Sequence, residues 1–534
     1  MNNSLIDSLK NPGIYDHAVT AFDVIETHIS WILLTGQYAY KIKKPVNFGF
    51  VDFSSLASRR HYCYKEVELN SRLAPELYLG VVSIGGSSNA PLLNKGEPIE
   101  YAVKMCQFSQ DALLSAVASR GELSLVHVEQ IVRLLSKFHQ QVNACDYDHP
   151  YGNPKRVVHW VNENFSHIRP LLSDPDDRER LKVINDWTIN ASCRLLSTMM
   201  MRKERGFIRE CHGDLHLGNM ALIDDKVTFF DCIEFNKELR WIDVINEAAF
   251  VAMDLEKSGY PRLSWHFFNR YLQETGDYSS IVLFRYYFVY RALVRAKVAL
   301  LRTVTGHVSQ EVTNAAWAEY RAYIDLAIDQ IQRWQPLMIL MHGLSGSGKS
   351  MVAERLAGLL GAVQLRSDLE RKRMFHVAPR KASGSALYQG IYTKDASSAV
   401  YDRLASLCCD ILSEGHPVII DATFLKFSQR EKFRKLAKTL SVPFEILSVS
   451  ASVDRLKARL RVRAQGASDV SEADEKVLMA QLERQDPLRG EEFAAATVID
   501  NDEAVSDEQF TELVADLCAK ATTMVTNEEP SMIA

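Results

Sequence analysis

One stretch of the sequence carries the residue types that a phosphoryl transfer needs. The run HGDLHLGNM places Asp214 and Asn219 in a D-x-x-x-x-N pattern, and Asp231 ends the later apolar run KVTFFD. An aspartate can orient and deprotonate a substrate hydroxyl, while an asparagine and a second aspartate hold Mg²⁺ against the phosphates of ATP. The pattern therefore predicts Asp214 as a catalytic base and Asn219 and Asp231 as metal ligands.

A second stretch, GLSGSGKS, fits the pattern G-x-x-x-x-G-K-[ST] and is of an unrelated kind. It lies between the apolar run LMILM and the helical sequence SMVAERLAGLL. Glycines let backbone N–H groups wrap phosphates, the lysine reaches the β- and γ-phosphates, and the final hydroxyl binds Mg²⁺. The motif predicts nucleotide binding by these residues, with Ser350 also a metal ligand: Gly343, Ser345, Gly346, Ser347, Gly348, Lys349 and Ser350.

Two further acidic residues end apolar runs in the same part of the chain. Asp421 ends VIIDAT and is expected at the Mg²⁺; no glutamate follows it, which weakens the case for a motor-type ATPase. In LRSDLERKR, Asp368 is followed three residues on by Arg371. A carboxylate there can accept the proton of an attacking hydroxyl, and a guanidinium can neutralise the transferring phosphoryl group. Asp368 and Arg371 are therefore predicted catalytic residues.

These features resemble a known group of kinases. The phosphate loop, the S-D-x-x-R at 367–371 and the D-A-T at Asp421 look like small-molecule and polynucleotide 5′-kinases, including the zeta-toxin group, over residues 337–487. In such kinases a lid that carries arginines closes over the phosphates. The resemblance implies Arg459 and Arg463 as lid residues, because they lie four apart and share a helix face. A solvated amphipathic helix explains either arginine equally well.

The first stretch resembles aminoglycoside and choline kinases, whose signature HGDxHxxN it matches between His212 and Asn219. That family has a protein-kinase-like fold, and its ATP-binding lysine lies on an A-x-K strand. The resemblance implies Lys41 as this lysine, with Lys43 as the alternative. It implies Glu66 as the helix glutamate that pairs with the lysine, with Glu68 as the rival. The chain lacks a G-x-G-x-x-G loop and an A-P-E segment, so it does not match a protein kinase.

The elements that must position these residues follow from the hydrophobic pattern. Residues 29–50 alternate around Gly36 as a β-hairpin does, a helix follows up to Pro75, and two strands are expected between 79 and 108. From about Asp111 the spacing is helical, apart from the short strands MALID and KVTFFD. Beyond Pro336 strands and helices alternate, as in a doubly wound α/β domain.

The predicted fold class is therefore α/β and α+β, with a protein-kinase-like two-lobed fold followed by a P-loop domain with a doubly wound parallel sheet. The predicted domains are a kinase-like N-lobe at 1–110, a helical C-lobe at 111–335 and a P-loop kinase domain at 336–505. A C-terminal helix and tail are expected at 506–534. Asp243 and Glu247 lie one helical turn apart, where they suit either a cationic substrate group or helix capping.

Composition narrows the functional class. The 534 residues are 47% hydrophobic and 24% charged, with a net charge of -5, which gives no general basic field for nucleic acid or anionic membrane. The nine cysteines show no C-x-x-C, as suits reduced thiols. The N-terminus lacks a signal-peptide pattern, and no apolar run reaches the roughly 20 residues that a bilayer requires. We therefore expect a cytoplasmic protein.

The order of the two halves resembles bacterial proteins described as fused aminoglycoside-phosphotransferase-like and ATP-binding proteins. This resemblance implies a bifunctional ATP-dependent phosphotransferase that uses Mg²⁺, with a small-molecule hydroxyl acceptor at each site. Two alternatives stay open. One is a regulator that binds ATP at one site and has one active kinase domain, and the other is a polynucleotide 5′-kinase in the C-terminal half. The sequence names neither acceptor nor the oligomeric state.

Overall fold

The computed structural model describes residues 3–47, 49, 51–304, 309–333, 335–378, 390–465 and 473–525. The chain divides into two compact units. The first consists of Met1–His167 with Ser192–Ser258, and the second of Ile168–Ala191 with Gly259–Ala534. The predicted domain boundaries at residues 110, 335 and 505 stay predictions.

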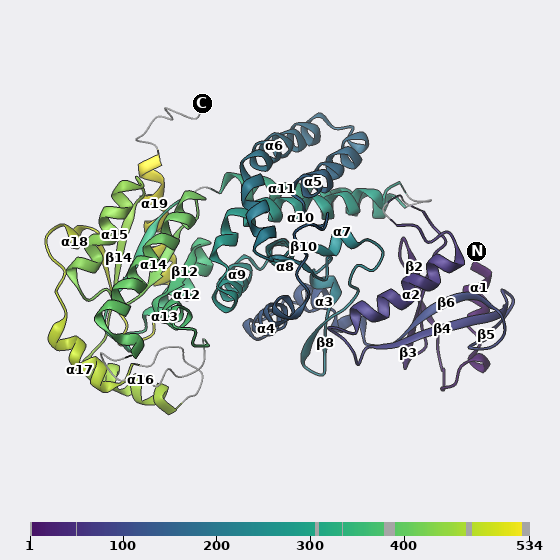
Figure 1. The fold of residues 1–534 in the computed structure, drawn as a ribbon, viewed down its shortest axis with the longest axis horizontal. Helices are drawn as coiled ribbons and strands as arrows, with labels where there is room; N and C mark the ends of the chain where they lie inside the picture. Colours follow the sequence, from purple (N-terminus) through teal and green to yellow (C-terminus); the bar gives the residue numbers. More distant parts are fainter. Residues whose placement is uncertain are drawn as a thin grey trace. The chain divides into compact units, whose positions relative to one another are not determined.

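The first unit contains a six-stranded antiparallel sheet in the order β1-β2-β3-β6-β4-β5 (Figure 1). The predicted hairpin is β2–β3, and Gly36 at its turn has a φ of 92°. Two strands were expected between residues 79 and 108, and this number is wrong, because the loop after β4 folds back as the short strand β5. The strands are β1 (Asp23–Glu26), β2 (Ser30–Leu34), β3 (Tyr38–Lys43), β4 (Tyr78–Ser87), β5 (Ala90–Leu93) and β6 (Pro98–Cys106).

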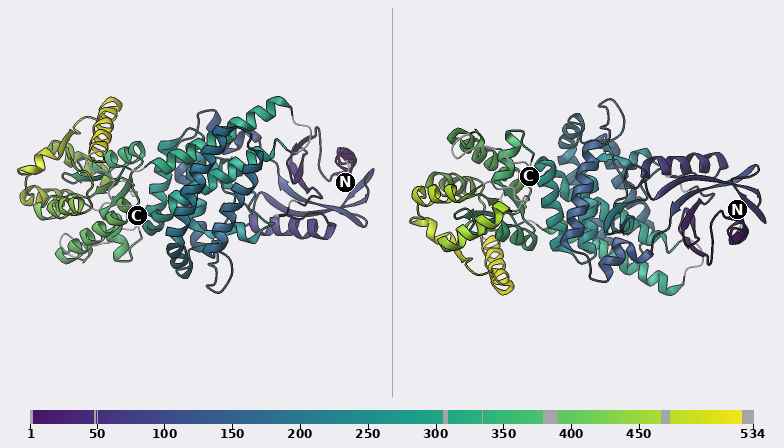
Figure 2. Two further views of the ribbon diagram at one scale, coloured as in Figure 1. Left: turned by 90° about the horizontal axis from the view of Figure 1, so that it is seen from above. Right: turned by 90° about the horizontal axis from the view of Figure 1, so that it is seen from below.

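The side chains of β3 alternate between the two faces of this sheet, as the period of a strand requires. Tyr40 and Ile42 pack with the helix α1 (Asn3–Leu9) in one apolar cluster. Ala39 packs on the opposite face, in the cluster that includes Cys63 of the helix α2 (Leu56–Asn70). Figure 2 shows α2 running along the strands. Because Lys41 and Lys43 share the face of Ala39, both lysines point toward α2.

The rest of the first unit is mostly helical, as predicted. Helix α4 buries the face that the periodicity indicates, including Val128, Ile131, Leu135 and Phe138. The expected strands MALID and KVTFFD form the hairpin β8 (Met220–Ile223) and β9 (Lys226–Phe229), whereas the three-residue strands β7 (Ile208–Glu210) and β10 (Trp241–Asp243) were missed. The helices are α3 (Leu114–Ser119), α4 (Leu125–Gln141), α5 (Pro154–Ile168), α7 (Lys237–Arg240) and α8 (Val244–Lys257), together with the part of α6 (Pro175–Glu204) that starts at Ser192.

In the second unit, the long stretch that starts at Gly259 begins with three helices. They are α9 (Pro261–Thr275), α10 (Ile281–Leu301) and α11 (Gln310–Gln332). A five-stranded sheet follows, in the order β12-β13-β11-β14-β15, with every pairing parallel. Its strands are β11 (Met338–His342), β12 (Val363–Arg366), β13 (Val418–Asp421), β14 (Phe444–Ser450) and β15 (Ala496–Asp500). The sequence predicted the first four of these strands and missed β15, in which no residue is buried.

Helices cover this parallel sheet, as in a doubly wound α/β domain (Figures 1 and 2). One core cluster joins Ile339 of β11 to Leu356 of α12 and Leu517 of α19. Helix α14 contacts the strand β13, and it also contacts the helix α15. The helices are α12 (Lys349–Leu360), α13 (Ser367–Met374), α14 (Lys394–Ser413), α15 (Phe427–Thr439), α16 (Val453–Gln465), α17 (Glu475–Arg484), α18 (Glu491–Ala494) and α19 (Asp507–Val525).

Among the residues that the structure describes, no helix combines the length and the apolar character needed to cross a bilayer.

Candidate active sites

The loop between β7 and β8 brings Asp214 and Asn219 together. The Nδ2 of Asn219 donates to the backbone oxygen of Asp214 at 2.9 Å and to its carboxylate Oδ2 at 3.2 Å. The Nε2 of His216 lies 3.7 Å from the same carboxylate oxygen. Asp231 adopts a φ of 65° just after β9, and its backbone N–H donates to the hydroxyl of Tyr78 at 3.1 Å. The loop is therefore held in a fixed shape around the predicted base.

Glu247 of α8 holds this loop in place through hydrogen bonds to the loop backbone. Its carboxylate accepts hydrogen bonds from the backbone N–H of Gly213 at 2.6 Å and of His212 at 3.3 Å, and the Nε2 of His139 lies 2.9 Å from it. Burial by itself would raise the pKa of Glu247, but the bond and charge of His139 outweigh burial and hold the pKa below its usual value. Glu247 is fully buried and is not available to bind a cationic substrate group.

Asp243 is also engaged within the fold. Both oxygens of its carboxylate accept from the guanidinium of Arg202, at 2.7 and 2.8 Å, and one accepts from the N–H of Ile245 at 3.1 Å. It is the N-cap of α8. Of the two interpretations that the sequence left open for Asp243 and Glu247, the geometry supports a structural role, and it gives no support to a cation-binding pair.

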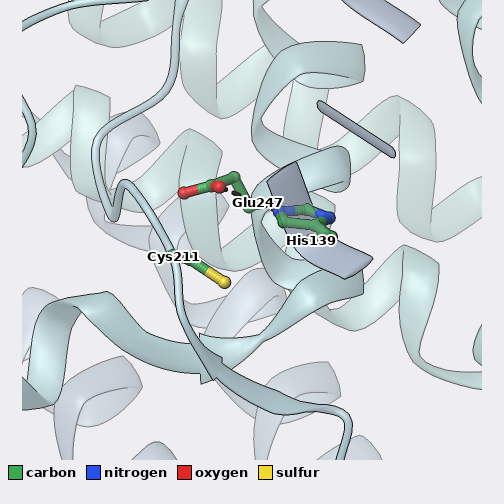
Figure 3. Close-up of side chains that lie close together, drawn as sticks. All are labelled: His139, Cys211 and Glu247. Atoms are coloured by element: carbon green, nitrogen blue, oxygen red, sulfur yellow. Dashed lines mark hydrogen bonds and ion pairs between the residues drawn. The ribbon is translucent and has the colours of Figure 1, made fainter. Parts of the chain in front are cut away.

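Figure 3 shows Cys211 close to His139 and Glu247. Possible ligand atoms of the three residues lie within 4.8 Å of one another, which is the spacing of a metal site. Those atoms are hydrogen-bonded inside the fold, since His139 meets Glu247 and the Sγ of Cys211 lies 3.7 Å from the carbonyl oxygen of Ile242. We therefore interpret the group as support for the catalytic loop. No sequence motif indicates this group, because its members lie on separate elements.

The two candidate lysines of β3 share one glutamate. The Nζ of Lys41 lies 2.8 Å from Oε1 of Glu66 and also contacts the carboxylate of Asp231. The Nζ of Lys43 lies 2.6 Å from Oε2 of Glu66 and also contacts Glu234. Lys41 is thus the lysine that reaches a predicted metal ligand. The rival Glu68 pairs instead with Lys65 on an exposed face of α2.

The charges of this cluster are matched inside the fold. Burial alone would raise the pKa of Glu66, but the two lysines outweigh burial and lower it to about 2. Burial opposes the charge of Lys43, yet the Glu234 and Glu66 carboxylates hold its pKa above the usual value. Burial raises the pKa of Glu234. Asp231 is the most exposed of the three carboxylates, which suits a group that must also meet a metal.

The phosphate loop of the second unit joins β11 to α12 and needs glycine at two places. Gly343 has a φ of 138°, and a Cβ there would lie 2.2 Å from the carbonyl oxygen of Val449. Gly348 has a φ of 93°, and a Cβ there would lie 2.1 Å from the Nδ2 of Asn501. Other residues would be strained at these angles, so the backbone shape depends on the motif glycines.

Lys349 stands where this loop meets α12, and the acidic side chains of the motif lie near it. Burial lowers the pKa of Lys349 to about 8, and the charges of Asp421 and Asp368 act in the opposite direction. Burial raises the pKa of Asp421, against the lowering influence of Arg366 and of a hydrogen bond from the Ser350 hydroxyl. The structure thus groups the motif lysine and serine with both predicted carboxylates.

The two predicted lid arginines have different partners. Arg459 contacts the carbonyl oxygens of Gly346 and Ser347 at 3.5 and 3.4 Å and donates to that of Asn501 at 2.6 Å. Arg463 donates to the carbonyl oxygen of Ala473 at 2.6 Å, and its charge lowers the pKa of Lys349. Arg463 is therefore the arginine close to the motif lysine. Both catalytic roles stay predictions.

Arg371 lies inside the second unit. It donates to the carbonyl oxygen of Ile391 at 3.0 Å and to the hydroxyl of Ser397 at 3.3 Å, and its guanidinium lies 5.1 Å from the ring centre of Tyr392. These contacts join α13 to the turn at Gly390–Tyr392 and to the first turns of α14. The role of Arg371 in neutralising a phosphoryl group stays a prediction.

Two polar residues at the phosphate loop were missed. The Oε1 of Gln481 accepts from the N–H of Ser345 at 2.9 Å, and its Nε2 donates to the hydroxyl of the same serine at 3.0 Å. The Nδ2 of Asn501 donates to the carbonyl oxygen of Ser347 at 2.7 Å. Both residues lie more than a hundred positions after the motif and belong to no recognisable pattern, so only the fold reveals them.

Both sites fit a nucleotide with Mg²⁺. In the first unit, Asn219 and Asp231 supply the amide and carboxylate oxygens that Mg²⁺ takes, beside the cationic Lys41. In the second unit, the turn at Gly348 exposes backbone N–H groups at the start of α12, next to Lys349. The donor sets therefore match the predicted ligands.

The chain thus joins a unit with an antiparallel sheet and a helical part to a P-loop domain with a parallel sheet. A family model described as an AAA domain matches residues 338–488. The uncharacterized protein Rv2004c of Mycobacterium tuberculosis (strain ATCC 25618 / H37Rv) is 31% identical over 473 residues, which cover 87% of this chain and 92% of that protein. The chain belongs to the same family as this mycobacterial protein.

Solved structures match each half. A gluconokinase from Sinorhizobium meliloti 1021 is 23% identical, covers 36% of this chain and 97% of its own, and gives a TM-score of 0.25. An ethanolamine kinase of Plasmodium vivax is 12% identical, covers 57% of this chain and 81% of its own, and gives a TM-score of 0.34.

Proposed function

We propose that the protein is a bifunctional ATP-dependent phosphotransferase, in which each unit moves the γ-phosphoryl group of ATP to a hydroxyl of a small-molecule acceptor. One observation carries the proposal. Each unit brings together a lysine for the phosphates, a carboxylate for the metal and a further aspartate suited to act as a base. Since none of the three is missing at either site, neither unit has the composition of a decayed kinase.

In the first unit, Asp214 is the base that orients the acceptor hydroxyl and takes its proton. The bond from Asn219 and the support from Glu247 hold the loop so that Asp214 keeps its position. Lys41 binds the ATP phosphates, and its contacts with Glu66 and Asp231 place the metal ligand beside them. Bound Mg²⁺ supplies charge neutralisation for the transferring phosphoryl group.

In the second unit, the loop around Gly348 binds the phosphates with its backbone N–H groups, and Lys349 adds positive charge. Ser350 and Asp421, which share a hydrogen bond, are the residues that would hold the metal. Asp368 accepts the proton of the acceptor, and Arg463, whose charge reaches Lys349, meets the developing charge. Because Lys349 is largely desolvated, its attraction for phosphate is strong.

The proposal is tested by ADP release from the full chain in the presence of a bacterial metabolite extract. The variants are Asp214→Asn, Asp368→Asn and the two combined. Loss of a general base lowers a rate by about 10²–10⁴-fold. We expect each single variant to remove a different part of the release and the double variant to remove both. Equal release from all four proteins would contradict the proposal.

A further inference from the structure

The helix α9 completes the edge of the parallel sheet in the second unit. β12 is an edge strand of that sheet, so its outer N–H and C=O groups lack a neighbouring strand. The Oδ1 of Asn269 in α9 accepts from the N–H of Gln364 at 2.7 Å, and its Nδ2 donates to the carbonyl oxygen of Ala362 at 2.8 Å. The Asn269 carboxamide therefore takes the place of a neighbouring strand at this edge.

Close packing holds α9 against α12, the helix that follows the phosphate loop. A Cβ on Gly361 would lie 3.1 Å from the ring of Trp265, and one on Gly358 would lie 3.4 Å from the carbonyl oxygen of Arg262. The Nδ1 of His266 lies 3.1 Å from Glu354 of α12. Since α9 is held by both β12 and α12, its side chains keep a fixed place relative to the phosphate loop.

A chain of two hydrogen bonds runs from α9 to the predicted metal carboxylate. The Nε2 of Gln273 donates to the Oε1 of Gln364 at 3.3 Å, and the Nε2 of Gln364 donates to Oδ2 of Asp421 at 3.2 Å. All three side chains are buried. Because Gln273 supplies a donor, the amide oxygen of Gln364 turns toward α9 and its amide NH₂ faces Asp421.

We propose that Gln273 is a positioning residue of the P-loop phosphotransferase, which orients Asp421 for Mg²⁺ through Gln364. The helix α9 then contributes a residue to the nucleotide site of the P-loop phosphotransferase. The inference rests on the proposed function of the second unit, in which Asp421 meets the metal. Groups that hold a metal ligand in place typically change metal affinity by about 10–100-fold when they are lost.

Two substitutions at Gln273 separate the orientation of the amide from its size. Gln273→Met keeps the length of the side chain and removes the donor. Gln273→Glu keeps the shape but offers only acceptors, so Gln364 must turn its NH₂ toward α9 and its oxygen toward Asp421. Two oxygens then face each other at the metal ligand. The matched control is Gln332→Met, at an exposed position on α11.

The experiment measures the Mg²⁺ concentration that gives half-maximal binding of a fluorescent, non-hydrolysable ATP analogue. It uses the full chain with Asp231→Asn, which removes the metal carboxylate of the first site. We expect Gln273→Met to raise this concentration about tenfold, Gln273→Glu to raise it further, and the control to leave it unchanged. A merely structural role would lower thermal stability without shifting the Mg²⁺ dependence. Values within twofold of the control for both Gln273 variants would overturn the inference.

The same proteins separate this inference from the proposed function. ADP release by the P-loop unit is measured in parallel in the chain that carries Asp231→Asn alone. If that protein releases no ADP but the Mg²⁺ dependence of analogue binding shifts as expected, the proposed activity fails and the role of Gln273 stands. If ADP is released and the Mg²⁺ dependence does not shift, the role of Gln273 fails and the activity stands.

Discussion

The Nζ of Lys43 lies 2.6 Å from Oε2 of Glu66, the carboxylate oxygen that Lys41 does not contact. Glu66 thus stays paired when Lys41 turns toward bound phosphates. Since Lys43 also contacts Glu234, one buried lysine joins the helix α2 to the segment that follows Asp231, the predicted metal ligand. This arrangement holds α2 against the segment after Asp231 through a buried charge pair.

Substitution of Lys41 should therefore lower activity, whereas substitution of Lys43 should lower the free energy of unfolding. Lys41→Met removes the cation that meets the phosphates, so we expect the activity of the first site to fall while the protein stays folded. Lys43→Met leaves buried carboxylates without a partner, and breaking a buried pair in this way costs about 3–5 kcal/mol of the free energy of unfolding. Urea unfolding and ADP release, measured on both variants, check the prediction.

Lys44→Met is the matched control on the same strand end, since Lys44 pairs with an exposed Glu26. Surface pairs of this kind contribute about 0–1 kcal/mol. Equal losses of stability in the Lys43 and Lys44 variants would show that the buried lysine does not hold the two segments together.

Glu247→Gln should loosen the catalytic loop of the first unit. The amide that replaces one carboxylate oxygen cannot accept the N–H groups of both His212 and Gly213. Hydrogen bonds to a charged group contribute about 1.5–3 kcal/mol each. We expect a loss of stability of this order and lower activity of the Asp214 site, with the P-loop site unchanged. Glu204→Gln, at an exposed position, should change neither quantity.

The Glu247 carboxylate should also make the stability of the protein depend on pH in the acidic range. Burial is the largest single influence and raises the pKa of Glu247, but the bond and charge of His139, the charge of His212 and the Gly213 N–H together hold it below the usual 4.5 in the folded protein. Its contribution to stability is therefore complete above pH 4.5 and is lost as pH falls through the lower folded value. The difference in unfolding free energy between wild type and Glu247→Gln should shrink over that range. A difference that grows with acid would show the opposite shift.

Lys349 gives a dependence on alkaline pH. Burial lowers its pKa from 10.5 to about 8, so between these values the unfolded chain binds more protons than the folded one. Stability attributable to this lysine should therefore rise with pH from about 8 to 10.5. Thermal unfolding across this range should show the rise in wild type and in the exposed control Lys435→Met. In Lys349→Met this rise in thermal stability should be absent, and a rise that persists in this variant would contradict the prediction.

The sequence predicted the parts of the sites that lie within short patterns. The loop of Asp214 and the glycine-rich loop before Lys349 take the form that their spacing indicates, because local backbone geometry dictates both. Lys41 and Lys43 were harder to separate, since residues two apart on a strand face the same side. Only the tertiary contact with Asp231 distinguishes them.

Contacts between distant elements lie beyond such patterns. Asp243 and Glu247 suggested a cation site because they share a helix face, but their partners Arg202 and His139 come from other helices. In the same way, nothing in the sequence of α9 indicates that Gln273 reaches Gln364. The missed strands β1, β5, β7, β10 and β15 are short or exposed, so their hydrophobic pattern is weak.

The central claim is that each unit phosphorylates an acceptor, and mass spectrometry of a bacterial metabolite extract tests it most directly. The extract is incubated with Mg²⁺, ATP and the full chain, as wild type, Asp214→Asn or Asp368→Asn. Asp224→Asn and Asp395→Asn, at exposed positions of the two units, are the controls. We predict two sets of products that gain one phosphoryl group, one lost with Asp214→Asn and the other with Asp368→Asn. The assignment of two kinase sites would be contradicted if the same products formed with both single variants. It would also be contradicted if wild type formed no phosphorylated product.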